Sequence, residues 1–205
     1  MRKYKLRGMS KLILNMTMSL DGFTAGPNIR PEEPMGDGGE ELHRWMFAGG
    51  STDENPGKFQ TEFFENIGAY IMGRRTLDLG LEPWGENPPY HAPCFVLSKE
   101  RHDTITKQGG TSFAFVTDGV HSAFKQAQAA AGSKDIIVMG GANAAQQFVN
   151  AGLFDELYIH VAHMLLGSGT RLFDNLTIKP TDLEKIAVTD ALGATHMKFR
   201  FRKLV

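Results

Sequence analysis

Val138-Met139-Gly140-Gly141-Ala142-Asn143 is the stretch that decides the fold. The apolar run over residues 135–139 stops at two glycines, and an Ala- and Gln-rich helical pattern covers residues 143–151. The pattern predicts a strand that feeds a tight glycine turn at a helix N-terminus. Such a turn offers free backbone N–H groups and the positive end of the helix dipole to a phosphate group. A plain packing turn has the same local pattern, so the ligand interpretation depends on the rest of the chain.

The composition indicates a globular protein with balanced charge. The chain has 205 residues, of which 41% are hydrophobic and 22% charged, and its net charge is −1. It can therefore bury a sizeable core, and nothing favours nucleic acid or a membrane as its partner. The single cysteine, Cys94, excludes an intramolecular disulfide. It fits a reducing compartment, so we expect a cytoplasmic protein.

The chain shows neither repeats nor a low-complexity linker, which predicts one domain over residues 11–205 after a flexible leader at residues 1–10. Several basic residues at the N-terminus precede an apolar stretch at residues 12–20, a pattern that a signal peptide can also have. The stretch contains polar residues and lacks a small-residue cleavage site, so a strand is favoured over a signal peptide. Residues 25–58 concentrate Gly and Pro around a short helix at 40–47. So long an irregular segment is typical of a functional lid or a disordered loop.

Alternating strand and helix patterns follow along the chain. Strands are expected at residues 11–20, 69–73, 94–97, 113–117, 135–139 and 156–165, and helices at 61–66, from 74, at 122–131 and at 143–151. Two alternating runs at 183–189 and 195–202 predict an antiparallel hairpin whose face with His196, Lys198 and Arg200 is wet. The order predicts an α/β domain with a central, mostly parallel sheet and antiparallel strands at its C-terminal end.

Ligands of such sheets bind beyond the carboxyl ends of the strands. Four strand ends here are polar or rich in glycine: Ser19-Leu20-Asp21-Gly22, Gly73-Arg74-Arg75-Thr76, Leu97-Ser98-Lys99 and Gly140-Gly141-Ala142-Asn143. Cations at a helix N-terminus oppose the helix dipole, so Arg74 and Arg75 indicate an anion nearby. Guanidinium groups also suit phosphate better than ammonium groups do.

In order and spacing these pieces resemble the dihydrofolate-reductase-like superfamily. They are most similar to the reductase (C-terminal) domain of bacterial bifunctional riboflavin-biosynthesis deaminase-reductases and its stand-alone relatives. The resemblance rests on the strand ends above and on Leu153-Phe154-Asp155-Glu156-Leu157 and Leu165-Leu166-Gly167-Ser168-Gly169. It implies a three-layer fold with helices on both faces of the sheet. It also implies an NADPH-dependent reductase of a small planar heterocycle, with 5-amino-6-(5-phosphoribosylamino)uracil reductase as the nearest activity, and a homodimer packed through the C-terminal strands.

The resemblance also implies roles for individual residues. The cofactor would be held by Gly73, Arg74, Arg75, Thr76, Ser98, Lys99, Gly140, Gly141, Ala142 and Asn143. Ser98 and Lys99 would face the adenosine ribose, which favours NADPH over NADH, and the peptide between the paired glycines would be cis. Asp21 is the candidate catalytic carboxylate, although Asp-Gly is also a strong turn pair. Phe23 and Trp45 are candidates for stacking on the substrate, and core packing explains each of them equally well.

Other chemistries find no support in the sequence. The glycine turns lack the G-x-G-x-x-G spacing, and His91-Ala92-Pro93-Cys94 lacks the Glu and the C-x-x-C pair of a zinc deaminase. His160 and His163 point to opposite faces of a strand, so we expect no metal site, and we interpret the remaining histidines as ordinary. Two alternatives stay open. One is an inactive nucleotide- or flavin-binding module. The other is a true dihydrofolate reductase. Enzymes of that kind have a characteristic spacing between a Trp and an acidic residue, and residues 40–47 do not match it.

Overall fold

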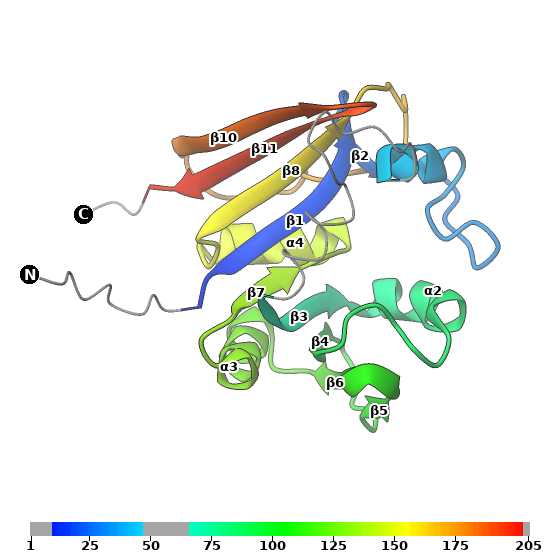
Figure 1. The fold of residues 1–205 in the computed structure, drawn as a ribbon, viewed down its shortest axis with the longest axis vertical. Helices are drawn as coiled ribbons and strands as arrows, with labels where there is room; N and C mark the ends of the chain where they lie inside the picture. The colour runs from blue at the N-terminus through cyan, green and yellow to red at the C-terminus, as the bar shows by residue number, and fades with distance from the viewer. Residues whose placement is uncertain (1–9, 47–65, 203–205) are drawn as a thin grey trace, which may run out of the picture.

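A nine-stranded sheet organises the computed structural model, which describes residues 10–46 and 66–202 (Figure 1). The strand order is β10-β11-β8-β1-β7-β3-β4-β6-β5. The bounds are β1 Leu12–Ser19, β3 Ile67–Gly73, β4 Pro93–Leu97, β5 Ile105–Thr106, β6 Ser112–Val116, β7 Asp135–Val138, β8 Glu156–Ala162, β10 Leu183–Ala191 and β11 Ala194–Phe201. Neighbours from β8 to β6 are parallel, whereas β10, β11 and β8 pair antiparallel, as do β5 and β6. The predicted mostly parallel sheet with a C-terminal hairpin is confirmed.

Helices cover both faces of the sheet, as predicted. α3 (Val120–Ala131) and α4 (Ala142–Asn150) pack on one face, and α2 (Arg74–Trp84) packs on the other. The helix α3 turns a stripe of alanines toward the sheet at a spacing of four residues, and all of them are buried. The described helices are each too short or too polar to span a membrane.

Several short elements complete the chain. β2 (Phe23–Ala25) pairs with β9 (Thr170–Arg171) in a separate ribbon, which was not predicted, and η2 (Gln108–Gly110) precedes β6. The helix expected at 40–47 is the 3₁₀ helix η1 (Gly39–Met46). β8 ends at Ala162 rather than at 165, because the Met164 amide donates to the Ala162 carbonyl and turns the chain. Residues 61–65 of the helix predicted at 61–66, and residues 1–9 of the leader predicted at 1–10, lie outside the described residues, while Ser10 is buried.

The central strand β1 presents apolar side chains to one face of the sheet and polar side chains to the other. Its residues Leu12 and Leu14 point into the core shared with α3 and α4. Asn15 and Thr17 alternate with them and point to the other face. On that face, β3 and β4 are apolar and pack against α2, whereas β1, β8 and β11 carry polar side chains. An open, polar half of the sheet therefore lies beside an apolar half covered by α2.

Candidate active site

A large cavity of about 1400 Å³ lies at the carboxyl ends of the strands and extends over the polar half of the sheet. All the residues predicted to hold the cofactor line it, from Gly73 to Thr76, at Ser98 and Lys99, and from Gly140 to Asn143. Trp45 lines it as well. The structure thus brings together three segments that lie far apart in the sequence.

The paired-glycine turn lies at the centre of this cavity wall. The peptide between Gly140 and Gly141 is cis, which confirms the prediction. Gly140 has φ +132°, a conformation that favours glycine, and a Cβ on Gly141 would lie 3.4 Å from Thr76 Oγ1. No side chain of the turn itself therefore stands between this backbone and the cavity.

Two helices begin at this turn, and neither has a side-chain cap. Gly141 is the N-cap of α4 and Gly73 is the N-cap of α2. The Gly73 amide donates to the Gly140 carbonyl at 2.7 Å, which holds the two helix starts side by side. The uncapped first-turn amides and both helix dipoles favour an anion at this place. A nucleotide pyrophosphate fits these residues.

The two arginines at the start of α2 are held by neighbours. Arg74 Nε donates to Asp78 Oδ1 at 2.6 Å, and its Nη1 contacts His102 Nε2. Its guanidinium carbon lies 5.3 Å from the centre of the Phe115 ring. Arg75 Nη2 donates to the Ile29 carbonyl at 3.3 Å and so links α2 to the segment after β2. Sequence reasoning missed the His102 contact, because nothing in the local pattern places residue 102 near α2.

Asp21 and Phe23 are not among the residues that line the cavity. The Asp21 carboxylate accepts hydrogen bonds from Ser19 Oγ and from the amides of Leu166 and Gly167, at 2.5, 3.0 and 2.7 Å. These bonds, first of all the one from Ser19, lower the pKa of Asp21 to about 2. Phe23 is buried under the Arg171 guanidinium, 4.2 Å from its ring centre. The geometry gives Asp21 the role of holding a turn, and it gives Phe23 a place in the packing.

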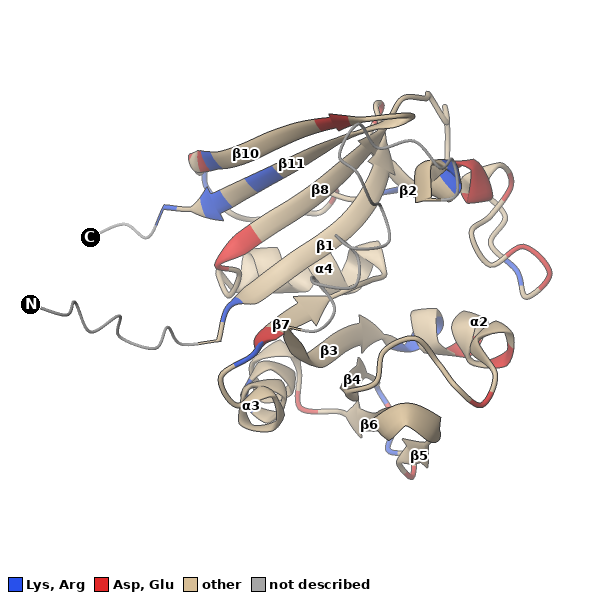
Figure 2. Cartoon of the chain, in the orientation of Figure 1, with Lys and Arg blue, Asp and Glu red and all other residues tan. Residues whose placement is uncertain are grey.

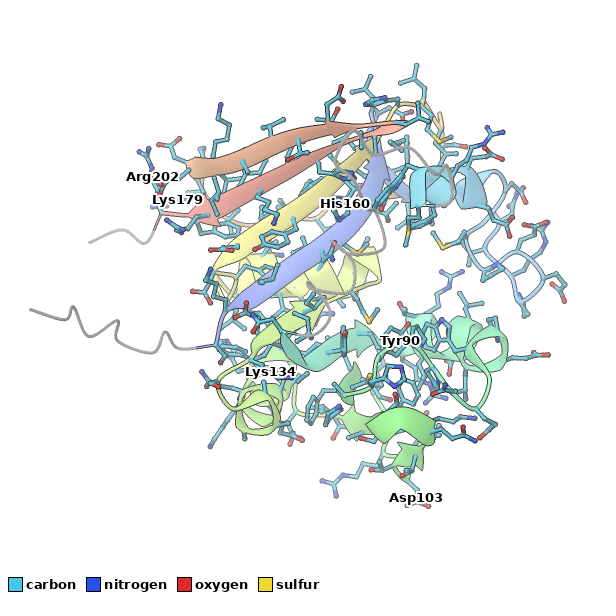
Figure 3. All side chains as sticks on the ribbon, viewed as in Figure 1. Tyr90, Asp103, Lys134, His160, Lys179 and Arg202 are labelled. Carbon is cyan, nitrogen blue, oxygen red and sulfur yellow. The ribbon has the colours of Figure 1, made fainter. Side chains whose placement is uncertain are left out.

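The polar half of the sheet forms the floor of the other end of the cavity. We call this set of cavity-lining residues the polar floor: Asn15 and Thr17 from β1, His160 from β8, and His196 and Lys198 from β11. His196 and Lys198, on the face of the hairpin that is predicted to be wet, are partly exposed and line this cavity. Figure 3 labels His160 on this side of β8.

The histidines of the polar floor are hydrogen-bonded to each other. His160 Nδ1 lies 2.8 Å from His196 Nδ1, and His160 Nε2 lies 2.8 Å from Asn15 Oδ1. Burial lowers the pKa of His160 to about 3, with His196 and Lys198 adding to the effect. Burial also lowers the pKa of His196. The sequence interpretation treats His196 as ordinary and does not pair it with His160, because only the register between β8 and β11 brings the two residues together.

His163 takes no part in this cluster. Its Nε2 pairs with Thr195 Oγ1 at 2.9 Å, and it does not line the cavity. Within residues 10–46 and 66–202, no group of three His, Cys, Asp or Glu side chains is arranged to hold a metal ion.

The chain matches one family model and is similar in sequence to a protein of Bacillus subtilis. Residues 10–192 match the family model described as the RibD C-terminal domain. The uncharacterized protein YyaP of Bacillus subtilis (strain 168) is 26% identical over 169 residues, which cover 80% of each chain.

Solved structures share the fold at low sequence identity. A protein assigned to riboflavin biosynthesis from Shewanella sp. PV-4 has a TM-score of 0.72 at 22% identity, covering 94% of this chain and 99% of the other. Dihydrofolate reductase from Enterococcus faecalis, complexed with NADP(H), has a TM-score of 0.58 at 13% identity, covering 95% and 98%. The deaminase/5-amino-6-(5-phosphoribosylamino)uracil reductase of Thermotoga maritima has a TM-score of 0.61 at 12% identity, covering 95% and 57%. The fold is thus dihydrofolate-reductase-like.

Proposed function

The chain belongs to the RibD C-terminal domain family, and we propose that it is an NADPH-dependent reductase of a small planar heterocycle. The nearest activity is that of a 5-amino-6-(5-phosphoribosylamino)uracil reductase, which the Thermotoga maritima relative carries in its name. One observation carries the proposal: every residue predicted for the cofactor lines one cavity, beside two uncapped helix N-termini.

The proposed cofactor arrangement follows from the charges and donors around the cavity. The first-turn amides of α2 and α4 would hold the pyrophosphate, with Thr76 Oγ1 beside the glycine turn. Arg74, Ser98 and Lys99 would meet the 2′-phosphate of NADPH, where cations and a hydroxyl are needed. Ser98 already forms a tight turn, since its Oγ accepts from the Glu100 amide at 3.1 Å and donates to the Glu100 carbonyl at 2.8 Å. When bound, the cofactor supplies the hydride.

The substrate would lie over the polar floor, next to Trp45. β1 joins the two ends of the cavity, because Met16 Sδ lies 3.7 Å from the position of a Cβ on Gly140 while Asn15 belongs to the polar floor. A planar ring placed there would be close to the turn that holds the cofactor. Trp45 and the sheet would shield it from water, which strengthens the polar contacts to it.

The alternative of a true dihydrofolate reductase is less well supported. Glu40 and Glu41, the acidic residues of η1, are exposed and do not line the cavity. The carboxylates among the described residues that do line it are Asp78, Glu100 and Asp190, and Asp78 is paired with Arg74. An inactive nucleotide-binding module remains the main rival, and measured turnover would exclude it.

We also propose that the protein is a cytoplasmic homodimer. β10 is an edge strand of the sheet, and its Leu183, Ile186 and Val188 are 38, 41 and 51% exposed. An exposed apolar edge strand suits pairing with a second copy. Light scattering on the purified protein tests this state, and Val188→Lys should shift it to a monomer. The buried free Cys94 fits a reducing compartment.

Titration with NADPH, followed by calorimetry, tests the proposed function. Binding should weaken strongly in Arg74→Ala and in Ser98→Ala, while His163→Gln, which changes a side chain outside the cavity, should bind like the wild type. Turnover is then measured with 5-amino-6-(5-phosphoribosylamino)uracil and with dihydrofolate. A purified, folded protein that shows no NADPH binding would refute the proposal.

A further inference from the structure

The polar floor is an unusual surface for the inside of an α/β sheet. β1 carries no charged residue, and β8 carries one only at Glu156, its first residue (Figure 2). In register, His160 lies beside Thr17 on one side and beside His196 on the other. Thr17 is buried and the other members of the row are partly buried. Polar groups removed from water cost free energy unless they are hydrogen-bonded, so the partners of this row matter.

The hydrogen bonds of the row fix the protons on both imidazoles. Asn15 Oδ1 can only accept, so His160 Nε2 is the donor across their 2.8 Å contact. Burial keeps the His160 ring neutral, so its Nδ1 carries no proton and must accept. His196 Nδ1 is therefore the donor in the 2.8 Å contact between the rings.

The Nε2 atom of His196, at the end of the row, is available to accept a hydrogen bond. In a neutral His196 with its proton on Nδ1, the Nε2 atom is a hydrogen-bond acceptor. Within residues 10–46 and 66–202, no partner reaches this atom, and the ring lines the cavity. Trp45 packs on both rings, with its centroid 5.0 Å from that of His160 and 4.7 Å from that of His196. The indole limits how far either ring can turn.

We propose that His196 contacts the substrate and accepts a hydrogen bond at Nε2 from a ring N–H of a planar heterocycle, and that Asn15 and His160 are positioning residues which set its tautomer. The inference rests on the proposed function, because it places the substrate over the polar floor. It adds the contact that would recognise such a substrate: a ring of the lactam or imide type offers an N–H group to this atom. Such a donor suits a neutral acceptor, whereas a cationic ring would favour a carboxylate.

The tautomer is tested first, in the unmodified protein. Long-range proton–nitrogen NMR of the ¹⁵N-histidine-labelled protein should show protons on Nε2 of His160 and on Nδ1 of His196. The His196 form is the less common tautomer of a free imidazole, so the assignment is diagnostic. The opposite pair of tautomers would overturn the proposal. Asn15→Leu removes the acceptor and should change the pattern, while His163→Gln, which lies outside the row, should keep it.

The ligand contact is tested with two matched probes. We expect 5,6-diaminouracil to shift the His196 Nε2 resonance, and 5,6-diamino-1,3-dimethyluracil, which has no ring N–H, to leave it unchanged. His196→Leu should weaken binding of the first probe about tenfold, His196→Gln should retain more of it, and His163→Gln should match the wild type. No shift with the first probe, or the same shift with both, would overturn the inference. A parallel titration with NADP⁺ tests the proposed function alone. A failure of the proposed function is therefore distinguished from a failure of the inference about His196.

Discussion

The Gly73 amide donates a 2.7 Å hydrogen bond to the Gly140 carbonyl, and this bond ties the ends of β3 and β7 together where α2 and α4 begin. The free amides that follow both glycines face the same cavity. Changes at this junction should therefore affect stability and cofactor binding together.

Gly140→Ala should lower the free energy of unfolding by about 1–3 kcal/mol, because φ is +132° there and a Cβ strains this conformation. The added methyl group should also weaken NADPH binding, since it stands at the proposed pyrophosphate position. Urea unfolding and calorimetric titration measure the two effects. Gly132→Ala is the matched control: its φ is +62° and nothing lies within 4 Å of the added Cβ, so it should lose stability and keep cofactor binding.

Arg74→Ala should reduce NADPH affinity by about 10- to 100-fold, the range expected for a lost charge-assisted hydrogen bond. The loss for NADH should be much smaller, because NADH lacks the 2′-phosphate. Equal losses for both cofactors would show that Arg74 acts on another part of the nucleotide. Asp78→Asn keeps the guanidinium and removes only the charge of its 2.6 Å partner, so a weaker effect of the same sign is expected.

His160 should make the protein less stable as the pH falls. Its pKa in the folded state is about 3, below the ordinary value of 6.5. Below pH 6.5 the His160 ring is therefore protonated in the unfolded chain but stays neutral in the folded protein. The free energy of unfolding should then fall by up to about 1.4 kcal/mol per pH unit from this one group, until the pH reaches the folded pKa. Urea unfolding over a pH series measures the slope. His160→Gln should flatten it, and an unchanged slope would contradict the burial of a neutral ring.

Asp21→Asn should lower thermal stability and leave NADPH affinity unchanged. The carboxylate holds the amides of Leu166 and Gly167, and an amide side chain has only one oxygen for both. Its folded pKa of about 2 is below the ordinary 3.8, so this stabilisation is present above pH 3.8 and is lost as the pH falls toward 2. A variant that keeps its melting temperature and loses all turnover would instead restore the catalytic role predicted for Asp21.

Local sequence patterns predicted which strand ends meet at the cavity. Gly140, Arg74 and Ser98 directly follow apolar strands, and parallel strands end at the same edge, so their proximity follows from the fold class. The polar floor could not be predicted in this way. It depends on the register that sets His196 opposite His160, across an antiparallel pairing that no local pattern specifies.

The same limit explains why the sequence predicts Asp21 and Phe23 in a site whose cavity they do not line. Both follow the first strand, as the cofactor segments follow theirs, but the chain turns away there. β2 pairs with β9, a strand of two residues with no periodic signal, and this ribbon carries Asp21 toward Gly167 and packs Phe23 under Arg171. Contacts of this kind arise between short segments that the sequence alone does not connect.

The position of β1 has a consequence for how the protein folds. Its Leu12 pairs with Ile136 of β7 and its Ile13 with Glu156 of β8, so both neighbours of this apolar strand come much later in the chain. During synthesis β1 must wait, unpaired, until β7 has been made. Such high contact order slows folding and exposes an aggregation-prone strand to the solvent. We therefore expect efficient production of the protein to depend on chaperones that bind extended apolar segments, and fragments that end before β8 to be insoluble.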